Sequence, residues 1–171
     1  FRYAMVGQNS RQQYIEALMA LVEGHIEQGN LVEALDALEN VRSVALSQEQ
    51  SVDVLLLKSR LYRLLGLADT AVAFLRDRAQ YILDSQLGAR IEFEMARCDI
   101  AKGDLEGARR RLSGVLSVAE PGPLAQKVAL ELSDVCLKLS RSPQAISICL
   151  QLLNSDVAAG TRQEALRLLA A

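Results

Sequence analysis

The sequence has no tryptophan, 3 prolines, 3 cysteines and a single histidine. Cys98, Cys136 and Cys149 are odd in number and form no Cys-x-x-Cys pair, which is neither the spacing of a disulfide scaffold nor that of a zinc site. His25 has no residues spaced around it as a catalytic triad or a metal site would require. We therefore expect buried thiols, no metal or other cofactor, and no enzyme active in its own right.

Neither sign of charge dominates, and no long apolar run is present. The 19 Lys and Arg residues oppose 21 Asp and Glu residues, for a net charge of -2. This balance argues against a nucleic-acid-binding polycation and against a disordered acidic tail. No stretch reaches the length of uncharged apolar sequence, about 18 residues, that spans a membrane. We predict no nucleic-acid partner and no membrane insertion within this segment.

Two residues that favour helices make up much of the chain. The sequence contains 30 leucines and 23 alanines among 171 residues, and both residues have high helix propensity. With so few prolines to interrupt them, these residues predict an all-α protein.

The chain repeats at a fixed interval of 37 residues. Alanine recurs at positions 34, 71, 108 and 145, and glycine at 29, 66 and 103, with Ser140 in the fourth place. Glycine ends a helix by adopting a positive φ, which any side chain disfavours. The alanine, early in the next helix, allows two helices to approach closely. The interval therefore predicts one antiparallel helical hairpin per repeat.

The predicted fold is an α-solenoid of about four stacked hairpins in a single domain, 1–171, with a half-repeat helix at the C-terminal end. The hairpins are expected at about 11–46, 48–85, 88–120 and 123–156, and the terminal helix at 161–171. The terminal helix either caps the stack or lacks its natural neighbour, so self-association through it is one outcome.

Several residues are expected to start the helices. Asn30 with Glu33 resembles a reciprocal cap, Asp104 can cap the helix that follows it, and Pro143 falls in a first turn. Thr161 is expected to cap the terminal helix. Within the chain, Glu120-Pro121-Gly122-Pro123 is the most conspicuous break between repeats.

We expect the sequence to be a segment of a longer protein. Phe1 stands where a methionine would begin a chain, and the pattern from Arg162 to Ala171 stops without a helix-terminating signal. The compartment is left open, with the cytoplasm slightly favoured over the cell envelope.

The second halves of the first and third repeats resemble the tetratricopeptide repeat (TPR). The matching residues are Gly29, Asn30, Leu31, Ala34 and Leu38 in the first repeat and Gly103, Asp104, Leu105, Ala108 and Leu112 in the third. Tyr62 keeps an aromatic of the family pattern, whereas the family's tryptophan is absent and the interval exceeds the usual length of about 34 residues. The sequence is identified as a degenerate, TPR-like protein.

The resemblance implies a right-handed superhelix whose first helices line a concave groove. In the family, this groove binds peptides or partner proteins. The expected function is therefore that of a non-enzymatic scaffold for protein–protein interaction.

Steps of 37 residues place the first-helix side chains in columns along this groove. One column is apolar, and the charged columns beside it concentrate arginines in the middle repeats. We predict an apolar floor with a basic centre, suited to a protein or peptide segment that carries an acidic group. The candidate residues are Met19, Glu23, Leu56, Arg60, Arg63, Arg90, Phe93, Arg97, Leu130 and Asp134.

Structural alternatives stand beside this interpretation. The apolar columns could be core, and the arginines could pair with acidic residues of adjacent helices. The expected acidic partners are Glu94, Asp99, Glu131 and Asp134. The run Arg109-Arg110-Arg111 is expected on a solvated outer face, and a Cys136–Cys149 disulfide is the lesser alternative to packed thiols.

Two other functions remain open. Hairpins of similar period read single-stranded RNA from their first helices, although the net charge and the apolar floor disfavour this function here. Such hairpins also form regulatory regions of transcription activators and signalling proteins, where they transmit the binding of a ligand.

Overall fold

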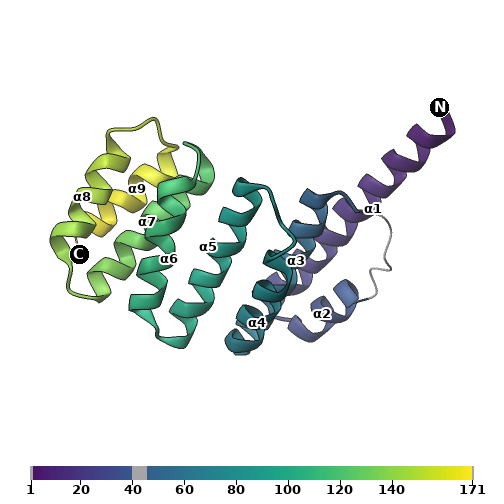
Figure 1. The fold of residues 1–171 in the computed structure, drawn as a ribbon, viewed down its shortest axis with the longest axis horizontal. Coiled ribbons are helices and arrows are strands. Elements are labelled where there is room, and N and C mark those ends of the chain that lie inside the picture. The colour runs from purple at the N-terminus through teal and green to yellow at the C-terminus, as the bar shows by residue number, and fades with distance from the viewer. Residues whose placement is uncertain (1, 40–45, 171) are drawn as a thin grey trace. The chain divides into compact units, whose positions relative to one another are not determined.

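The computed structural model describes residues 2–39 and 46–170, with side chains described from Gln13 onward. These residues form nine α-helices and no strand (Figure 1), so the all-α prediction is confirmed. The helices are α1 (Arg2–Glu27), α2 (Leu31–Glu39), α3 (Gln48–Leu64), α4 (Ala68–Ala79), α5 (Ser85–Lys102), α6 (Leu105–Val118), α7 (Pro123–Lys138), α8 (Ser142–Leu153) and α9 (Ala159–Leu169). The predicted end of the first hairpin at 40–45, and Ala171, lie outside the described residues.

The chain divides into two compact units, Phe1–Leu75 and Arg76–Ala171, and the division falls within α4. In the first unit, α1 packs on α2 and α3. In the second unit, α5 packs on α6 and α7 on α8, and α9 contacts both α7 and α8. A single domain over residues 1–171 stays a prediction.

The turn inside each hairpin has a left-handed residue at the predicted place. The φ angles are 78° at Gly29, 78° at Gly66, 82° at Gly103 and 58° at Ser140. The next residue's N–H then donates back to a carbonyl five residues earlier, as in the Schellman motif. These bonds join Asn30 to His25, Leu67 to Tyr62, Asp104 to Asp99 and Arg141 to Cys136, at 2.8 to 2.9 Å. The interval of 37 residues is thus present in the backbone.

The seam between the two helices of each hairpin is built from the predicted small residues. Ala34, Ala71, Ala108 and Ala145 are all buried, as are the residues four positions later. The first helices contribute a buried column of their own, Val22, Ser59, Ala96 and Ser133, again in steps of 37. Small side chains on both helices permit the close approach that the alanines predict.

The helix starts confirm some predicted caps and correct others. Asp104 accepts a hydrogen bond from the Gly107 N–H at 2.8 Å, and Pro143 lies in the first turn of α8, as predicted. The reciprocal cap of Asn30 with Glu33 stays a prediction; the Asn30 side-chain amide donates to Gln28 Oε1 at 3.2 Å. A capping box that was not predicted joins Ser47 and Gln50 at the start of α3.

The first and last helices begin earlier than predicted. α1 begins at Arg2 rather than near residue 11, and α9 begins at Ala159. Thr161 therefore does not cap α9, and its hydroxyl lies 3.5 Å from Oε1 of Gln126 on α7.

The three cysteines are free and buried, as the packing interpretation predicts, and no disulfide joins Cys136 to Cys149. Burial raises the pKa of the Cys136 thiol. Cys136 therefore serves as a neutral packing residue in α7.

Candidate functional site

All ten candidate groove residues are half-buried. They therefore belong neither to the core nor to the fully solvated surface. The first unit holds Met19, Glu23, Leu56, Arg60 and Arg63, and the second holds Arg90, Phe93, Arg97, Leu130 and Asp134.

In the first unit, Arg60 on α3 pairs with Glu23 on α1. Arg60 Nη1 donates to the two carboxylate oxygens of Glu23 at 2.7 and 2.9 Å. Both side chains remain more than one-third exposed, so water screens the pair. Met19 packs against the core of this unit. Glu23 lies 37 residues before Arg60, so it occupies the equivalent position of the preceding repeat. Its carboxylate balances the positive charge of Arg60.

In the second unit, Arg97 on α5 is surrounded by two carboxylates and a ring. Its Nε lies 3.1 Å from Glu131 on α7, and its Nη1 lies 3.4 Å from Glu94. The guanidinium carbon lies 5.8 Å from the centre of the Phe93 ring, within cation–π range. Glu94 and Glu131 are two of the partners that the structural alternative names, so the predicted basic centre is partly neutralised.

Leu130 and Asp134 of α7 line an open hollow of about 500 Å³ against α9. Lys138 binds Asp134 at 2.7 Å, and Arg167 binds Glu164 at 2.6 Å. The Glu164 carboxylate raises the pKa of Arg167, with a smaller contribution from Asp134. The lining residues are Lys127, Leu130, Glu131, Asp134, Lys138, Glu164, Arg167 and Leu168. Basic and acidic groups thus alternate in the hollow.

Glu164 and Arg167 line this hollow but are not among the ten predicted groove residues. The 37-residue interval could have predicted them. One further step of 37 residues leads from Lys127 to Glu164 and from Leu130 to Arg167. The set ends with the fourth repeat, while the surface of the second unit continues onto α9.

The prediction that Arg109, Arg110 and Arg111 lie on a solvated outer face is wrong for Arg109 and Arg111, which are half-buried. Arg110 is exposed, as predicted. Arg111 Nε donates to Asp99 at 2.8 Å and its Nη1 donates to Glu92 at 2.7 Å. Although its own burial opposes the charge, these two carboxylates raise the pKa of Arg111. Asp99 was expected to pair with an arginine of the groove, but it pairs with Arg111 on α6, the second helix of its own hairpin.

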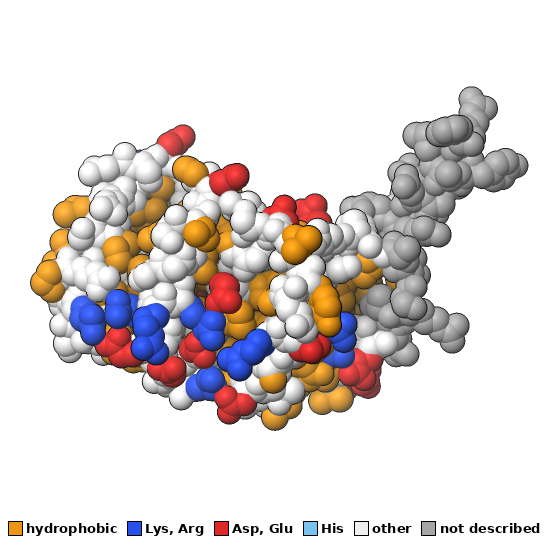
Figure 2. All heavy atoms as spheres, in the orientation of Figure 1, with side chains coloured by type: hydrophobic (Ala, Val, Ile, Leu, Met, Phe, Trp, Pro, Cys, Tyr) orange, Lys and Arg blue, Asp and Glu red, His pale blue; other side chains and the backbone are white. Residues whose placement is uncertain are grey.

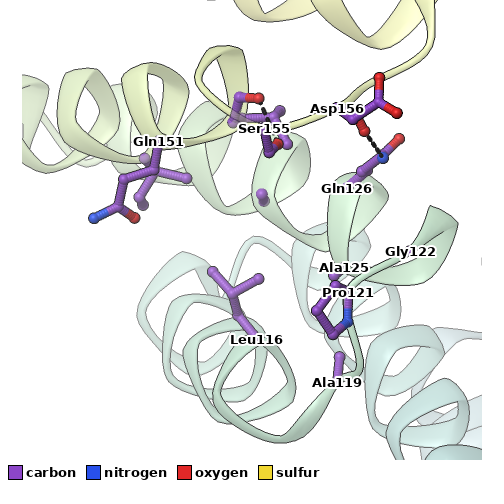
Figure 3. A pocket seen from close by; sticks show the side chains of 12 residues that line it. Leu116, Ala119, Pro121, Gly122, Ala125, Gln126, Gln151, Ser155 and Asp156 are labelled. Atoms are coloured by element: carbon purple, nitrogen blue, oxygen red, sulfur yellow. Dashed lines mark hydrogen bonds between the residues drawn. The ribbon is translucent and has the colours of Figure 1, made fainter.

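A second hollow of about 520 Å³ lies between α6, the start of α7 and the end of α8 (Figure 3). Leu116 points into it from α6, and Gln126 Nε2 donates to the Asp156 carbonyl at 3.3 Å at its rim. Most of the lining is apolar. No sequence pattern predicted this hollow, although its wall includes Pro121 and Gly122 of the conspicuous break between repeats.

Charged side chains on the second unit are mixed in sign. On its face in Figure 2, basic and acidic side chains are interspersed rather than gathered by sign. Within 2–39 and 46–170, no group of three or more His, Cys, Asp and Glu residues is placed to hold a metal ion. No helix in the same ranges combines the length and apolarity needed to cross a membrane.

Comparison with solved structures identifies the fold. Searches with the sequence match no protein-family model and no curated protein. The crystal structure of kinesin light chain-like TPR-like repeats from Podosopora anserina superposes with a TM-score of 0.71 at 18% identity, covering 92% of this chain and 84% of that one. A single-residue variant of that protein gives the same values. MamA superposes with a TM-score of 0.57 at 15% identity, covering 87% of this chain and 90% of that one. The chain therefore has a tetratricopeptide-like helical-repeat fold.

Proposed function

We propose that this chain is a non-enzymatic scaffold that binds a peptide or a segment of a partner protein on its first helices. Folds of this type commonly mediate protein–protein interaction. The proposed binding surface on each unit consists of the candidate residues of that unit, extended in the second unit by Glu164 and Arg167.

The observation that carries this proposal is the apolar column of Met19, Leu56, Phe93 and Leu130. All four side chains are half-buried, whereas the column of Val22, Ser59, Ala96 and Ser133 is buried in every repeat. An apolar side chain left in water forgoes about 25 cal/mol per Å² of the stabilisation that burial would supply. A partner with apolar side chains would cover this area in each repeat.

Arg60 and Arg97 are partly exposed and can therefore bind the acidic group expected on the partner. Ion pairs of this kind contribute about 0.2–1 kcal/mol each, because water competes for both charges. A partner's carboxylate can therefore join or replace Glu23 at Arg60, and Glu131 at Arg97, at little cost.

The apolar part of the proposal is tested with Leu130→Glu. Peptides are selected from a displayed library on the 171-residue chain, and their affinities are measured by fluorescence anisotropy. We expect Leu130→Glu to weaken binding at least tenfold, about 1.4 kcal/mol. The matched control is Leu83→Glu, which places the same charge at an almost fully exposed leucine in the α4–α5 connection.

Melting curves of both variants show whether the fold survives. If Leu130→Glu lowers the melting temperature, Leu130→Gln replaces it. Equal affinities for the Leu130 and Leu83 variants would show that the apolar column is not the binding surface.

The charged part is tested separately with Arg60→Glu and Arg97→Glu together. We expect this double change to weaken capture of an acidic peptide while the fold stays intact. In a second variant, Glu23→Arg combined with Arg60→Glu exchanges the two charges and keeps the pair. If the exchange leaves affinity at the wild-type level, Arg60 serves only its pair with Glu23, and the acidic group is not recognised there.

A further inference from the structure

The hollow between α6, the start of α7 and the end of α8 is separate from the proposed binding surface, because none of the ten candidate groove residues lines it. Its lining residues all belong to the second unit and run from Leu116 to Asp156. In the chain, α5 precedes them and α9 follows them. The hollow is therefore formed by the body of this unit.

The wall of the hollow is apolar. Leu116 enters it from α6, Ile148 and Leu152 from α8, and Ala125 from α7 (Figure 3). Its volume of about 520 Å³ falls within the range of sites that bind small ligands, roughly 300–1,000 Å³. The hollow therefore has room for a large apolar side chain that enters from outside.

The polar groups of the lining make few demands on an occupant. Gln126 Nε2 already donates to the Asp156 carbonyl at 3.3 Å, and the Ser155 hydroxyl donates to the Leu152 carbonyl at 2.7 Å. Gln151 is exposed, so its amide is hydrated. An apolar side chain can therefore fill the hollow without leaving a buried polar group unpaired.

The connections that lead from one hairpin to the next helix give this edge of the second unit an acidic character. Three such connections lie in the unit, at 80–84, 119–122 and 154–158. Each contains one carboxylate and no lysine or arginine. The three carboxylates are those of Asp84, Glu120 and Asp156.

Hydrogen bonds hold these connections beside the hollow. Asp156 lines it, and Glu120 lies between two lining residues of the α6–α7 connection. The backbone N–H of Gln86 donates to Asp84 Oδ1 at 2.8 Å. The Gln86 side chain donates to the Val118 carbonyl and accepts from the Glu120 N–H, each at 3.4 Å. Asp84 therefore belongs to the same edge as Glu120.

The basic side chains of this unit lie elsewhere. In Figure 2, the interspersed charges lie toward the turns inside the hairpins, whereas acidic and no basic side chains are visible over the α6–α7 and α8–α9 connections. Lys127 follows Gln126 in the sequence, but it lines the other hollow, against α9. A cation that approaches the α6–α7–α8 hollow therefore meets carboxylates on this face.

The helix ends add to this negative potential. α6 and α8 end beside the hollow, and α7 begins there. A helix carries about half a negative charge at its C-terminus and about half a positive charge at its N-terminus. Two negative ends outweigh one positive end, so the helix ends have the same net sign as the carboxylates.

We propose that this hollow is a second docking site, for a partner protein segment in which a large apolar side chain is flanked by lysine or arginine. The apolar side chain fills the hollow, and the flanking cations meet Glu120 and Asp156 at its rim. Both carboxylates are exposed, so salt should weaken the attraction. This inference does not depend on the proposed function, whose surface lies on the first helices and whose partner carries an acidic group.

The test follows the amide chemical shifts of the isotope-labelled 171-residue chain by NMR. The probe is a short peptide with one phenylalanine between two lysines. We expect shifts to gather at lining residues such as Leu116, Ala125 and Ser155. A peptide with glutamates in place of the lysines, and one with glycine in place of the phenylalanine, should each bind about tenfold more weakly or worse.

The apolar part of the inference is tested by filling the hollow. Ala125→Leu places a larger side chain in it, and we expect the affinity for the lysine peptide to fall about tenfold or more. The matched control is Ala101→Leu, at an exposed position of α5, which should bind like the wild type. If Ala125→Leu melts early, Ala119→Leu replaces it, since Ala119 also lines the hollow.

The charged part is tested by removing the two rim carboxylates. Glu120→Gln combined with Asp156→Asn should weaken binding about threefold or more and make it less sensitive to salt. Asp84 is left unchanged, because it caps α5. The control, Glu27→Gln combined with Glu49→Gln, removes two exposed carboxylates from the first unit and should have no effect.

Three results would each overturn the proposal. One is the absence of shifts at the lining residues even with millimolar lysine peptide. The second is equal affinity for the lysine and glutamate peptides, and the third is unchanged affinity in Ala125→Leu. Shifts confined to Met19, Leu56, Phe93 and Leu130 would also overturn it, because they would place the peptide on the first helices.

Discussion

Ser140 has the same left-handed backbone as Gly103, 37 residues earlier, with φ angles of 58° and 82°. Among the described residues, Ser140 is the one non-glycine residue with a positive φ. A residue with a Cβ is disfavoured there by about 1–2 kcal/mol relative to the right-handed region. The turn of the fourth hairpin is therefore imposed by the packing of α7 on α8 rather than by local preference.

Ser140→Gly should stabilise the chain. Removing the Cβ relieves the strained conformation, and the greater freedom of glycine in the unfolded chain offsets part of the gain. We expect a net gain of about 0.5–1 kcal/mol in the free energy of unfolding, measured by urea denaturation.

The reverse change at Gly103 serves as the control. A Cβ at Gly103 meets no atom within 4 Å, so Gly103→Ser tests the backbone alone. We expect a loss of about 1 kcal/mol. If Ser140→Gly destabilises the protein, or if Gly103→Ser has no effect, the two positions are not equivalent.

Ala71→Leu should overpack the seam of the second hairpin. Ala71 is fully buried in α4, and added side-chain atoms in a packed core cost about 1–3 kcal/mol. The matched control is Ala73→Leu, at an exposed position of the same helix, where a change of less than about 0.5 kcal/mol is expected. An unchanged melting temperature for Ala71→Leu would refute the seam.

Arg111→Met should destabilise the third hairpin, because it removes the hydrogen bond to the buried Asp99 carboxylate. Lys102, at 3.4 Å, is left as the partner of Asp99. Leaving a buried acceptor without its hydrogen bond costs about 1–3 kcal/mol, which urea denaturation measures.

Adding Asp99→Cys to Arg111→Met should restore part of this stability. Cysteine occupies the equivalent position of the next repeat, at Cys136, where it is buried and neutral. If the two changes are instead additive in their cost, Asp99 and Arg111 do not act as a pair.

Stability should depend on pH through Glu106. Its carboxylate accepts hydrogen bonds from Arg109 at 3.0 Å and from Arg141 at 2.6 Å, and these contacts, Arg109 foremost, lower its pKa. A folded-state pKa below the unfolded value stabilises the fold at neutral pH, and this contribution disappears as the pH falls through the folded pKa.

Glu106→Gln should therefore melt below the wild type at neutral pH. The difference in melting temperature should shrink toward zero as the pH falls through the lowered folded-state pKa of Glu106, below which the carboxyl is protonated in both states. A difference that stays constant over this range would assign the effect to something other than the charge of Glu106.

The turns could be predicted from the sequence because their causes are local. A glycine followed by an alanine five residues later marks the end of one helix and the beginning of the next, and it recurs at a constant interval. The start of α9 is predicted less well. Thr161 is a good capping residue, yet its hydroxyl lies against Gln126 of a distant helix, a contact that no local pattern contains.

In the candidate site, too, the positions of residues could be predicted from the sequence, whereas their contacts with distant residues could not. Steps of 37 residues lead to Met19, Leu56, Phe93 and Leu130, which are all half-buried. That these residues form the floor of a groove stays a prediction. The steps do not show which carboxylate each arginine binds, because long side chains reach several partners on neighbouring helices. Arg111, expected in solvent, turns inward since Asp99 is buried on the helix that faces it.

The most direct test of the repeat is the φ angle of residues 29, 66, 103 and 140 in solution, obtained from NMR chemical shifts and coupling constants of the assigned chain. Positive φ is expected at all four residues, with helical shifts on both sides of each. A negative φ at Ser140, or a helix or strand continuing through any of the four positions, would contradict the constant interval on which the hairpins and the proposed binding surface depend.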